Sequence, residues 1–227
     1  MKYKSAMVTQ ASGSVGGMTF SHNRFGNYVR ARAIPVNPNT VDQVNARNRF
    51  SYFAAQWRTL NAAARATWQT WADAVSKNDP LGDPMFLTAF QWYLSISTQR
   101  MQAGLTPITL APIVLALTNL TTPSVSVVGG TDVVSVIYDD TEPWAITDLG
   151  FLLIFAGRPQ NPTRNFYRGP WRLGTIVLGE TATPPTPPAT FTSPFPTAPG
   201  LRQWFRFVAQ DSTGRPSAVT YDDAVAT

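Results

Sequence analysis

Aromatic side chains are interleaved with a cluster of arginines in the first fifty residues of the chain. Arginine forms paired hydrogen bonds with phosphate or carboxylate groups, and an aromatic ring stacks on an unpaired nucleic-acid base. The pattern therefore indicates a contact surface for nucleic acid, or for carboxylates of a partner or of this chain's own C-terminal half. The candidate contact residues are Arg24, Phe25, Tyr28, Arg30, Arg32, Arg47 and Arg49.

The net charge is divided unevenly along the 227 residues. Residues 1–58 contain eight Lys or Arg and one acid, Asp42, so their net charge is +7. Residues 106–227 have a net charge of −2, which is too small to neutralise that cluster. A basic cluster without internal counter-charges favours a partner that carries negative charge. Only 14% of all residues are charged, as in proteins that bury much of their surface against partners.

The residue types needed for catalysis or metal binding are scarce. The chain has no cysteine and one histidine, His22, which lies inside the basic segment. The glycine-rich run 13–17 lacks the Gly-Lys-Ser/Thr ending of a phosphate loop, and the acidic run at Asp139, Asp140 and Glu142 does not have the spacing of an EF-hand. We therefore expect a protein that is not an enzyme, with no cofactor and no metal site, and we interpret the acidic run as a solvated turn.

The basic segment itself is predicted to form an arm over residues 1–39. Met18–Ser21 and Tyr28–Arg32 alternate between apolar and polar residues around a turn-rich stretch, which predicts a β-hairpin. The two prolines at positions 35 and 38 then impose an extended backbone.

Residues 40–104 are predicted to be a tryptophan-rich helical segment. Thr40 is a suitable N-cap, a second helix restarts at Asn61, and a third is expected from Met85 to about Gln102. Trp57, Trp68, Trp71 and Trp92 fall on apolar helical faces and favour a small helical core.

Residues 105–123 are predicted to be a linker, and residues 124–227 a β domain. Short candidate strands separated by turn signals favour an antiparallel sandwich of the immunoglobulin or fibronectin type III class. The stretch Pro184–Pro199 contains seven prolines and is excluded from a central strand. The predicted fold class is therefore α+β. The candidate strands are Ser124–Val128, Val133–Tyr138, Phe151–Ala156, Trp171–Val177, Leu201–Ala209 and Ala218–Tyr221.

Several blocks occur in an order that resembles a family of uncharacterised phage- and prophage-encoded proteins. They are GSVGGMTFSHNRFGNYVRAR, PVNPNT, AAQWRTL, AARATWQTWA and DPMFLTAFQWYLSIS, within residues 12–104. The resemblance implies a virion or phage-morphogenesis context and a variable, Pro-rich, β-sandwich-like C-terminal domain. It implies no activity and supplies no catalytic residues.

We therefore expect a structural protein of a bacteriophage virion, such as a minor capsid, decoration, connector or tail component, anchored by its basic arm and helices. Its expected partners are capsid, portal or tail subunits in an oligomeric assembly, with packaged DNA as a further contact. No membrane span is expected, and the chain would be made in the bacterial host cytoplasm and located in the virion. Two alternatives are a DNA-binding protein of the particle or host cell, and a carbohydrate-binding adhesin that uses Trp144 or Trp171 of the sandwich.

Overall fold

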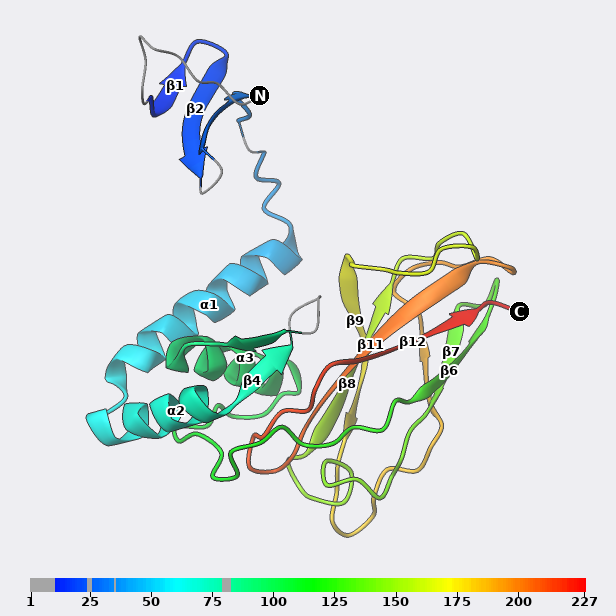
Figure 1. Cartoon of the computed structure of the whole chain (residues 1–227). Coiled ribbons are helices and arrows are strands. Elements are labelled where there is room, and N and C mark those ends of the chain that lie inside the picture. Colours follow the sequence, from blue (N-terminus) through cyan, green and yellow to red (C-terminus); the bar gives the residue numbers. More distant parts are fainter. Residues whose placement is uncertain (1–10, 24–25, 35, 79–82) are drawn as a thin grey trace. The chain divides into compact units, whose positions relative to one another are not determined.

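The computed structural model describes residues 11–23, 26–34, 36–78 and 83–227 of an α+β chain (Figure 1). The chain divides into two compact units, Met1–Asn45 and Ala46–Thr227, and each is described by itself. No helix within the described residues is long and apolar enough to cross a membrane.

The N-terminal unit contains a three-stranded antiparallel sheet. Strands β1 (Gly13–Val15), β2 (Met18–Asn23) and β3 (Gly26–Ala31) follow one another in the order β1-β2-β3. The predicted hairpin is β2–β3, and the glycine-rich run that precedes it supplies a further strand. Gly16 has a φ of 57°, which a residue without a Cβ adopts readily in the tight turn between β1 and β2.

Three helices follow, and side-chain caps set where two of them begin. They are α1 (Val41–Thr59), α2 (Ala62–Ala74) and α3 (Ala89–Gln102). The Asn61 side chain accepts a hydrogen bond from the Ala64 backbone at 2.7 Å. Thr88 and Gln91 form a reciprocal capping box. The predicted start of the third helix at Met85 is wrong, because Pro84–Phe86 forms β5 and pairs with β4 (Ser76–Asn78).

Aromatic side chains make the core of the helical part. Trp68, Trp71 and Trp92 are fully buried, as the apolar helical faces predict. Trp71 packs edge-on against Trp92, with ring centroids 5.8 Å apart, and Trp68 packs edge-on against Tyr93 at 5.4 Å. Such edge-to-face pairs favour one defined packing arrangement over a loosely filled core.

The C-terminal half forms two antiparallel sheets (Figure 1). One has the order β10-β7-β6, and the other β12-β11-β8-β9. Alternate residues of both sheets, including Val134, Ile154 and Phe207, belong to one buried cluster, so the two sheets share a core. The strands are β6 (Ser124–Val128), β7 (Val133–Ile137), β8 (Phe151–Gly157), β9 (Trp171–Leu178), β10 (Ala189–Thr192), β11 (Arg202–Gln210) and β12 (Thr220–Val225). Strand β10 contains no proline but lies between the prolines of the proline-rich stretch, and it is an edge strand, not a central one.

Helix α3 packs on the outer face of the four-stranded sheet. Every residue of β8 is buried, which explains why its sequence FLLIFAG is a continuous apolar run without alternation. Phe151 and Leu153 belong to a cluster that includes Ala103, just after α3. The Gln210 side-chain amide of β11 donates to the Ile96 carbonyl of α3 at 3.2 Å.

The segment of residues 105–123 is attached at several points. The Trp68 indole donates to the Thr109 carbonyl at 3.0 Å, and the Arg100 Nε donates to the Thr106 carbonyl at 2.9 Å. Further along, the Thr118 amide donates to the Pro216 carbonyl at 3.0 Å. Residues 46–227 group as one compact unit, while the division into a helical segment, a linker and a β domain stays a prediction.

Candidate functional site

The N-terminal sheet places two of the predicted contact residues on one face. The register pairs Tyr28 with Ser21 and Arg30 with Thr19, so Tyr28 and Arg30 project to the same side. Arg32 directly follows β3, and its amide donates to the Gly17 carbonyl at 2.8 Å. Both arginines are exposed, and neither forms an ion pair with another described residue. This face therefore presents positive charge beside an aromatic ring.

The opposite face of the same sheet is apolar. Met18 is paired with Ala31 and Phe20 with Val29, and both pairs point away from Arg30. Val15 is 72% exposed and Met18 is 52% exposed within the described residues. The small sheet thus has one basic polar face and one apolar face, on which Val15 and Met18 are exposed.

The other predicted contact residues are not gathered with these. Arg24 and Phe25 lie outside the described residues. Arg47 and Arg49 lie on α1 in the second unit, where Arg47 is exposed and Arg49 is half-buried. Residues two positions apart on a helix do not share a face, so these two arginines do not form one contact patch.

A second candidate site lies within the unit of residues 46–227, and no sequence pattern pointed to it. It is a cleft of ≈ 680 Å³ between β4 and the outer face of the four-stranded sheet, and we call it the cationic cleft. Among its described lining residues are two cations, Lys77 and Arg168, and no Asp or Glu. The main lining side chains are Lys77, Asn78, Tyr167, Arg168, Trp171 and Tyr221.

One wall of the cationic cleft is the outer face of the sheet. Arg206 of β11 is paired with Tyr221 on one side and with Phe155 on the other. Its guanidinium carbon lies 4.2 Å from the centre of the Phe155 ring and 5.8 Å from that of Trp171. Tyr167 packs edge-on against Trp171 at 4.9 Å. Arg206 is thus held among aromatic rings beside the cleft.

The facing wall carries Lys77 of β4. Its Nζ lies 4.5 Å from the centre of the Trp92 ring and 3.5 Å from the Ser95 hydroxyl. Burial, together with the neighbouring Arg206 guanidinium, lowers the pKa of Lys77 below its ordinary value of 10.5. Burial also lowers the pKa of Arg206, against an opposing effect of Tyr221.

These cations have no carboxylate partner in the described part of the chain. Its two ion pairs are Arg202–Asp223 and Arg215–Asp211, and neither includes Lys77, Arg168 or Arg206. The buried Nε of Arg206 also makes no hydrogen bond with a described residue. Two neighbouring positive charges removed from water are costly, and an anion placed between them would lower that cost.

The acidic run after β7 has a structural role instead. Glu142 is 7% exposed, which corrects its interpretation as part of a solvated turn. Its carboxylate accepts hydrogen bonds from the Trp144 indole at 2.8 Å and from the Thr121 amide at 2.5 Å. Trp144 is fully buried and belongs to the core between the sheets. Hydrogen bonds from Thr141 lower the pKa of the exposed Asp139.

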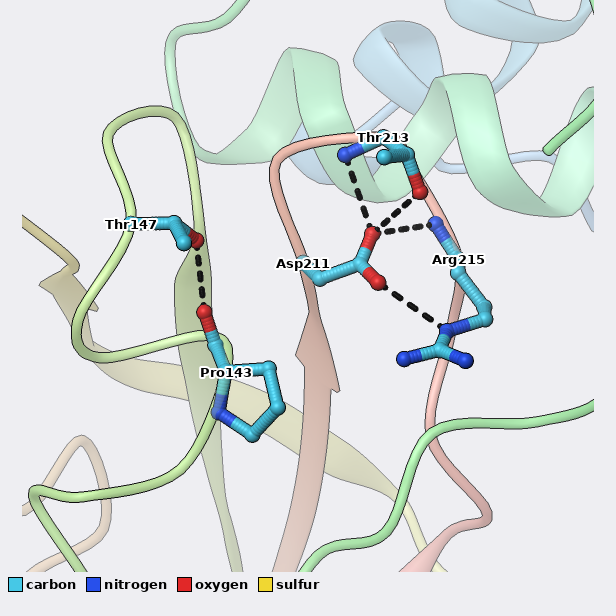
Figure 2. Close-up of polar contacts among 5 residues, drawn as sticks. All are labelled: Pro143, Thr147, Asp211, Thr213 and Arg215. Carbon is cyan, nitrogen blue, oxygen red and sulfur yellow. Dashed lines mark hydrogen bonds and ion pairs between the residues drawn. The ribbon is translucent and has the colours of Figure 1, made fainter. Parts of the chain in front are cut away.

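Asp211 organises the turn that follows β11, as Figure 2 shows. One carboxylate oxygen accepts from the Thr213 amide and hydroxyl and from the Arg215 amide, at 2.6–3.0 Å. The other oxygen accepts from the Arg215 Nε at 3.0 Å. This turn directly follows Gln210, so it fixes the end of the strand that holds α3 against the sheet.

The chain matches no protein-family model, no curated protein and no solved structure. The two surfaces described above are therefore interpreted from their own chemistry.

Proposed function

We propose that the protein is a non-enzymatic structural component of a bacteriophage virion, a minor capsid, decoration, connector or tail subunit. In this proposal the N-terminal unit is the anchor and the unit of residues 46–227 contacts neighbouring subunits. The phage context comes from the ordered sequence blocks of residues 12–104. The anchoring role comes from the N-terminal sheet.

The observation that carries the proposal is the two-faced N-terminal sheet. Sheets as small as this one, with strands of three to six residues, need to bury an apolar face to be stable. Val15 and Met18 are exposed on one face and Arg30 on the other. A partner surface with an apolar patch would cover Val15 and Met18, and carboxylates near that patch would neutralise Arg30.

A second region with exposed apolar side chains also supports a role in assembly. Leu110, Ile113, Val114 and Leu115 lie close together in the sequence, and each is exposed, Ile113 by 93%. Consecutive exposed apolar residues favour association and are avoided on the surfaces of freely soluble domains. This stretch is a contact surface for a neighbouring subunit in the proposal.

We also propose that the two sheets of the C-terminal half form a sandwich of the fibronectin type III kind. Seven antiparallel strands in the orders β10-β7-β6 and β12-β11-β8-β9 support this assignment. In an immunoglobulin constant-type domain the fourth strand belongs to the sheet of the first two. Here the fourth strand, β9, pairs with the third, β8, in the other sheet, which favours the fibronectin arrangement.

The virion proposal is tested on particles. Mass spectrometry of purified phage particles from the strain that carries the gene should detect the chain at a copy number that is constant between preparations. Antibody labelling in the electron microscope should place it at one part of the particle. Absence from particles that contain their capsid and tail proteins would reject the proposal.

The register of the N-terminal sheet favours DNA binding as a second candidate function. Tyr28 and Arg30 share a face, so a base could stack on the ring while a phosphate meets the guanidinium. Binding of a single-stranded oligonucleotide should then weaken steeply with salt and with the substitution Arg30→Gln. The adhesin alternative would depend on Trp171, because Trp144 is buried and bonded to Glu142.

A further inference from the structure

The cationic cleft combines three features of a binding site for a small molecule. Its volume of ≈ 680 Å³ lies inside the range of roughly 300–1,000 Å³ that such sites have. Its described lining residues include the cations Lys77 and Arg168 and no carboxylate. It also includes the aromatic side chains of Trp171 and Tyr221, and Tyr221 is 52% exposed.

The cations indicate that the ligand carries an oxyanion. The Arg206 guanidinium is close enough to lower the pKa of Lys77, and neither side chain is ion-paired within the described part of the chain. Lys77 is already oriented by the Trp92 ring and the Ser95 hydroxyl. Arranging two like charges side by side costs free energy, and a bound phosphate would recover it through charge-assisted hydrogen bonds.

The aromatic residues indicate that a flat ring accompanies the oxyanion. Trp171 and Tyr221 lie with their ring centroids 5.9 Å apart on the sheet wall, next to the cations. Sugar recognition is less well supported, because sugar hydroxyls need several hydrogen-bond partners. Two of the hydroxyl groups that line the cleft are already engaged. Ser217 donates to the Ala218 carbonyl and accepts from the Ala209 amide, and Tyr167 donates to the Pro170 carbonyl and accepts from the Arg158 amide. A base or another aromatic ring needs only stacking.

We propose that the cationic cleft binds a nucleotide, with its phosphate between Lys77 and Arg168, which line the cleft, and its base against Trp171 and Tyr221. Arg206 does not line the cleft and adds its positive charge from behind Trp171. The source is a free nucleotide or the end of a nucleic-acid strand, since both present the same chemistry. This site lies in the unit of residues 46–227, so it goes beyond the virion role and does not depend on it.

The test is calorimetric titration of the full chain at low ionic strength with thymidine monophosphate. We expect saturable binding, with thymidine and inorganic phosphate each weaker by about tenfold, because each lacks one of the two recognised groups. A short thymidine oligonucleotide that competes with the monophosphate identifies a strand end as the source. An oligonucleotide that does not compete identifies the free nucleotide.

Three substitutions probe the walls of the cleft. Lys77→Met keeps the aliphatic stem over Trp92 and removes the charge, and we expect a loss of affinity of about tenfold. Arg168→Met and Tyr221→Ser change exposed side chains, so they test the cleft even if the Lys77 variant fails to fold. Arg58→Met is the matched control, because it removes an exposed positive charge on α1 and should leave affinity unchanged.

Four results would overturn the proposal. The first is no binding of thymidine monophosphate, and the second is equal affinity for thymidine, which would show that phosphate is not recognised. The third is unchanged affinity in the folded cleft variants, which would place binding elsewhere on the chain. The fourth is selective binding of a sugar acid such as galacturonate, which would assign the cleft to a glycan.

Discussion

Individual charged residues of this chain fall into two groups that have opposite consequences for stability. Glu142 and Asp211 are charged, largely buried and fully engaged by donors. Lys77 and Arg206 are also drawn out of water, but the described part of the chain offers them no carboxylate. The first group holds the fold together, whereas the second lowers its stability and is explained more simply by a ligand.

Replacing Glu142 with Ala should destabilise the protein. The substitution leaves the Trp144 indole and the Thr121 amide without their acceptors in a buried position, which should lower the free energy of unfolding by about 3 kcal/mol. Urea denaturation measures the change. Asp140→Ala, which removes a neighbouring acid, is the control, and equal losses in the two variants would show that the buried hydrogen bonds are unimportant.

Replacing Lys77 with Met should leave stability at neutral pH unchanged or higher. The pKa of Lys77 is lowered in the folded state, so the unfolded chain binds this proton more tightly. The contribution of Lys77 to wild-type stability therefore improves as the pH rises through the lowered pKa towards 10.5, its ordinary value. The difference between variant and wild type should shrink over that pH range in thermal melts. A loss of more than about 1 kcal/mol in the variant at pH 7 would show that Lys77 stabilises the fold.

At the scale of elements, local sequence signals located most of the structure. Alternation of apolar and polar residues predicts the hairpin β2–β3, and the cap at Asn61 predicts where α2 begins. The apolar run that begins at Phe151 predicts β8. The start of α3 was misplaced, because the apolar residues Met85 and Phe86 extend the helical pattern across a cap at Thr88. Periodicity alone does not reveal that β5 pairs with β4.

The capping box gives a prediction at this scale. Thr88→Ala removes the acceptor of the Gln91 amide and should lower the free energy of unfolding by about 1 kcal/mol. Thr70→Ala is the matched control, because Thr70 lies on the exposed face of α2 and alanine has the higher helix propensity. Chemical denaturation of both variants gives the comparison, and equal effects would show that Thr88 does not fix the start of α3.

At the scale of the whole molecule, the cationic cleft was beyond prediction from the sequence for a physical reason. Lys77 lies in a stretch that the sequence marks only as a break between helices, and Arg206 lies in an alternating strand. They become neighbours because α3 packs on the outer face of β8 and β11. The basic N-terminal segment, by contrast, could be recognised directly, since its charge excess is contiguous in the sequence.

The N-terminal unit gives the last prediction, which separates anchoring from folding. Arg30 and Arg32 are exposed, and neither forms an ion pair with another described residue. Substitution of both by Gln should therefore change the free energy of unfolding by only about 0.5 kcal/mol per site. Because the same two charges would meet an acidic partner in an assembled particle, the variant should enter particles at a reduced copy number, which quantitative mass spectrometry measures.

The matched control for that experiment is the double substitution of Arg58 and Arg65 by Gln, which removes two exposed charges from the helices instead. If the control variant is depleted from particles to the same extent, overall charge governs incorporation and the N-terminal sheet is not the anchor. If the Arg30 and Arg32 variant instead unfolds, the arginines stabilise the chain itself. The anchoring prediction is met if both variants melt like the wild type and only the Arg30 and Arg32 variant is depleted from particles. An acidic partner surface that contacts the basic face of the sheet would explain that result.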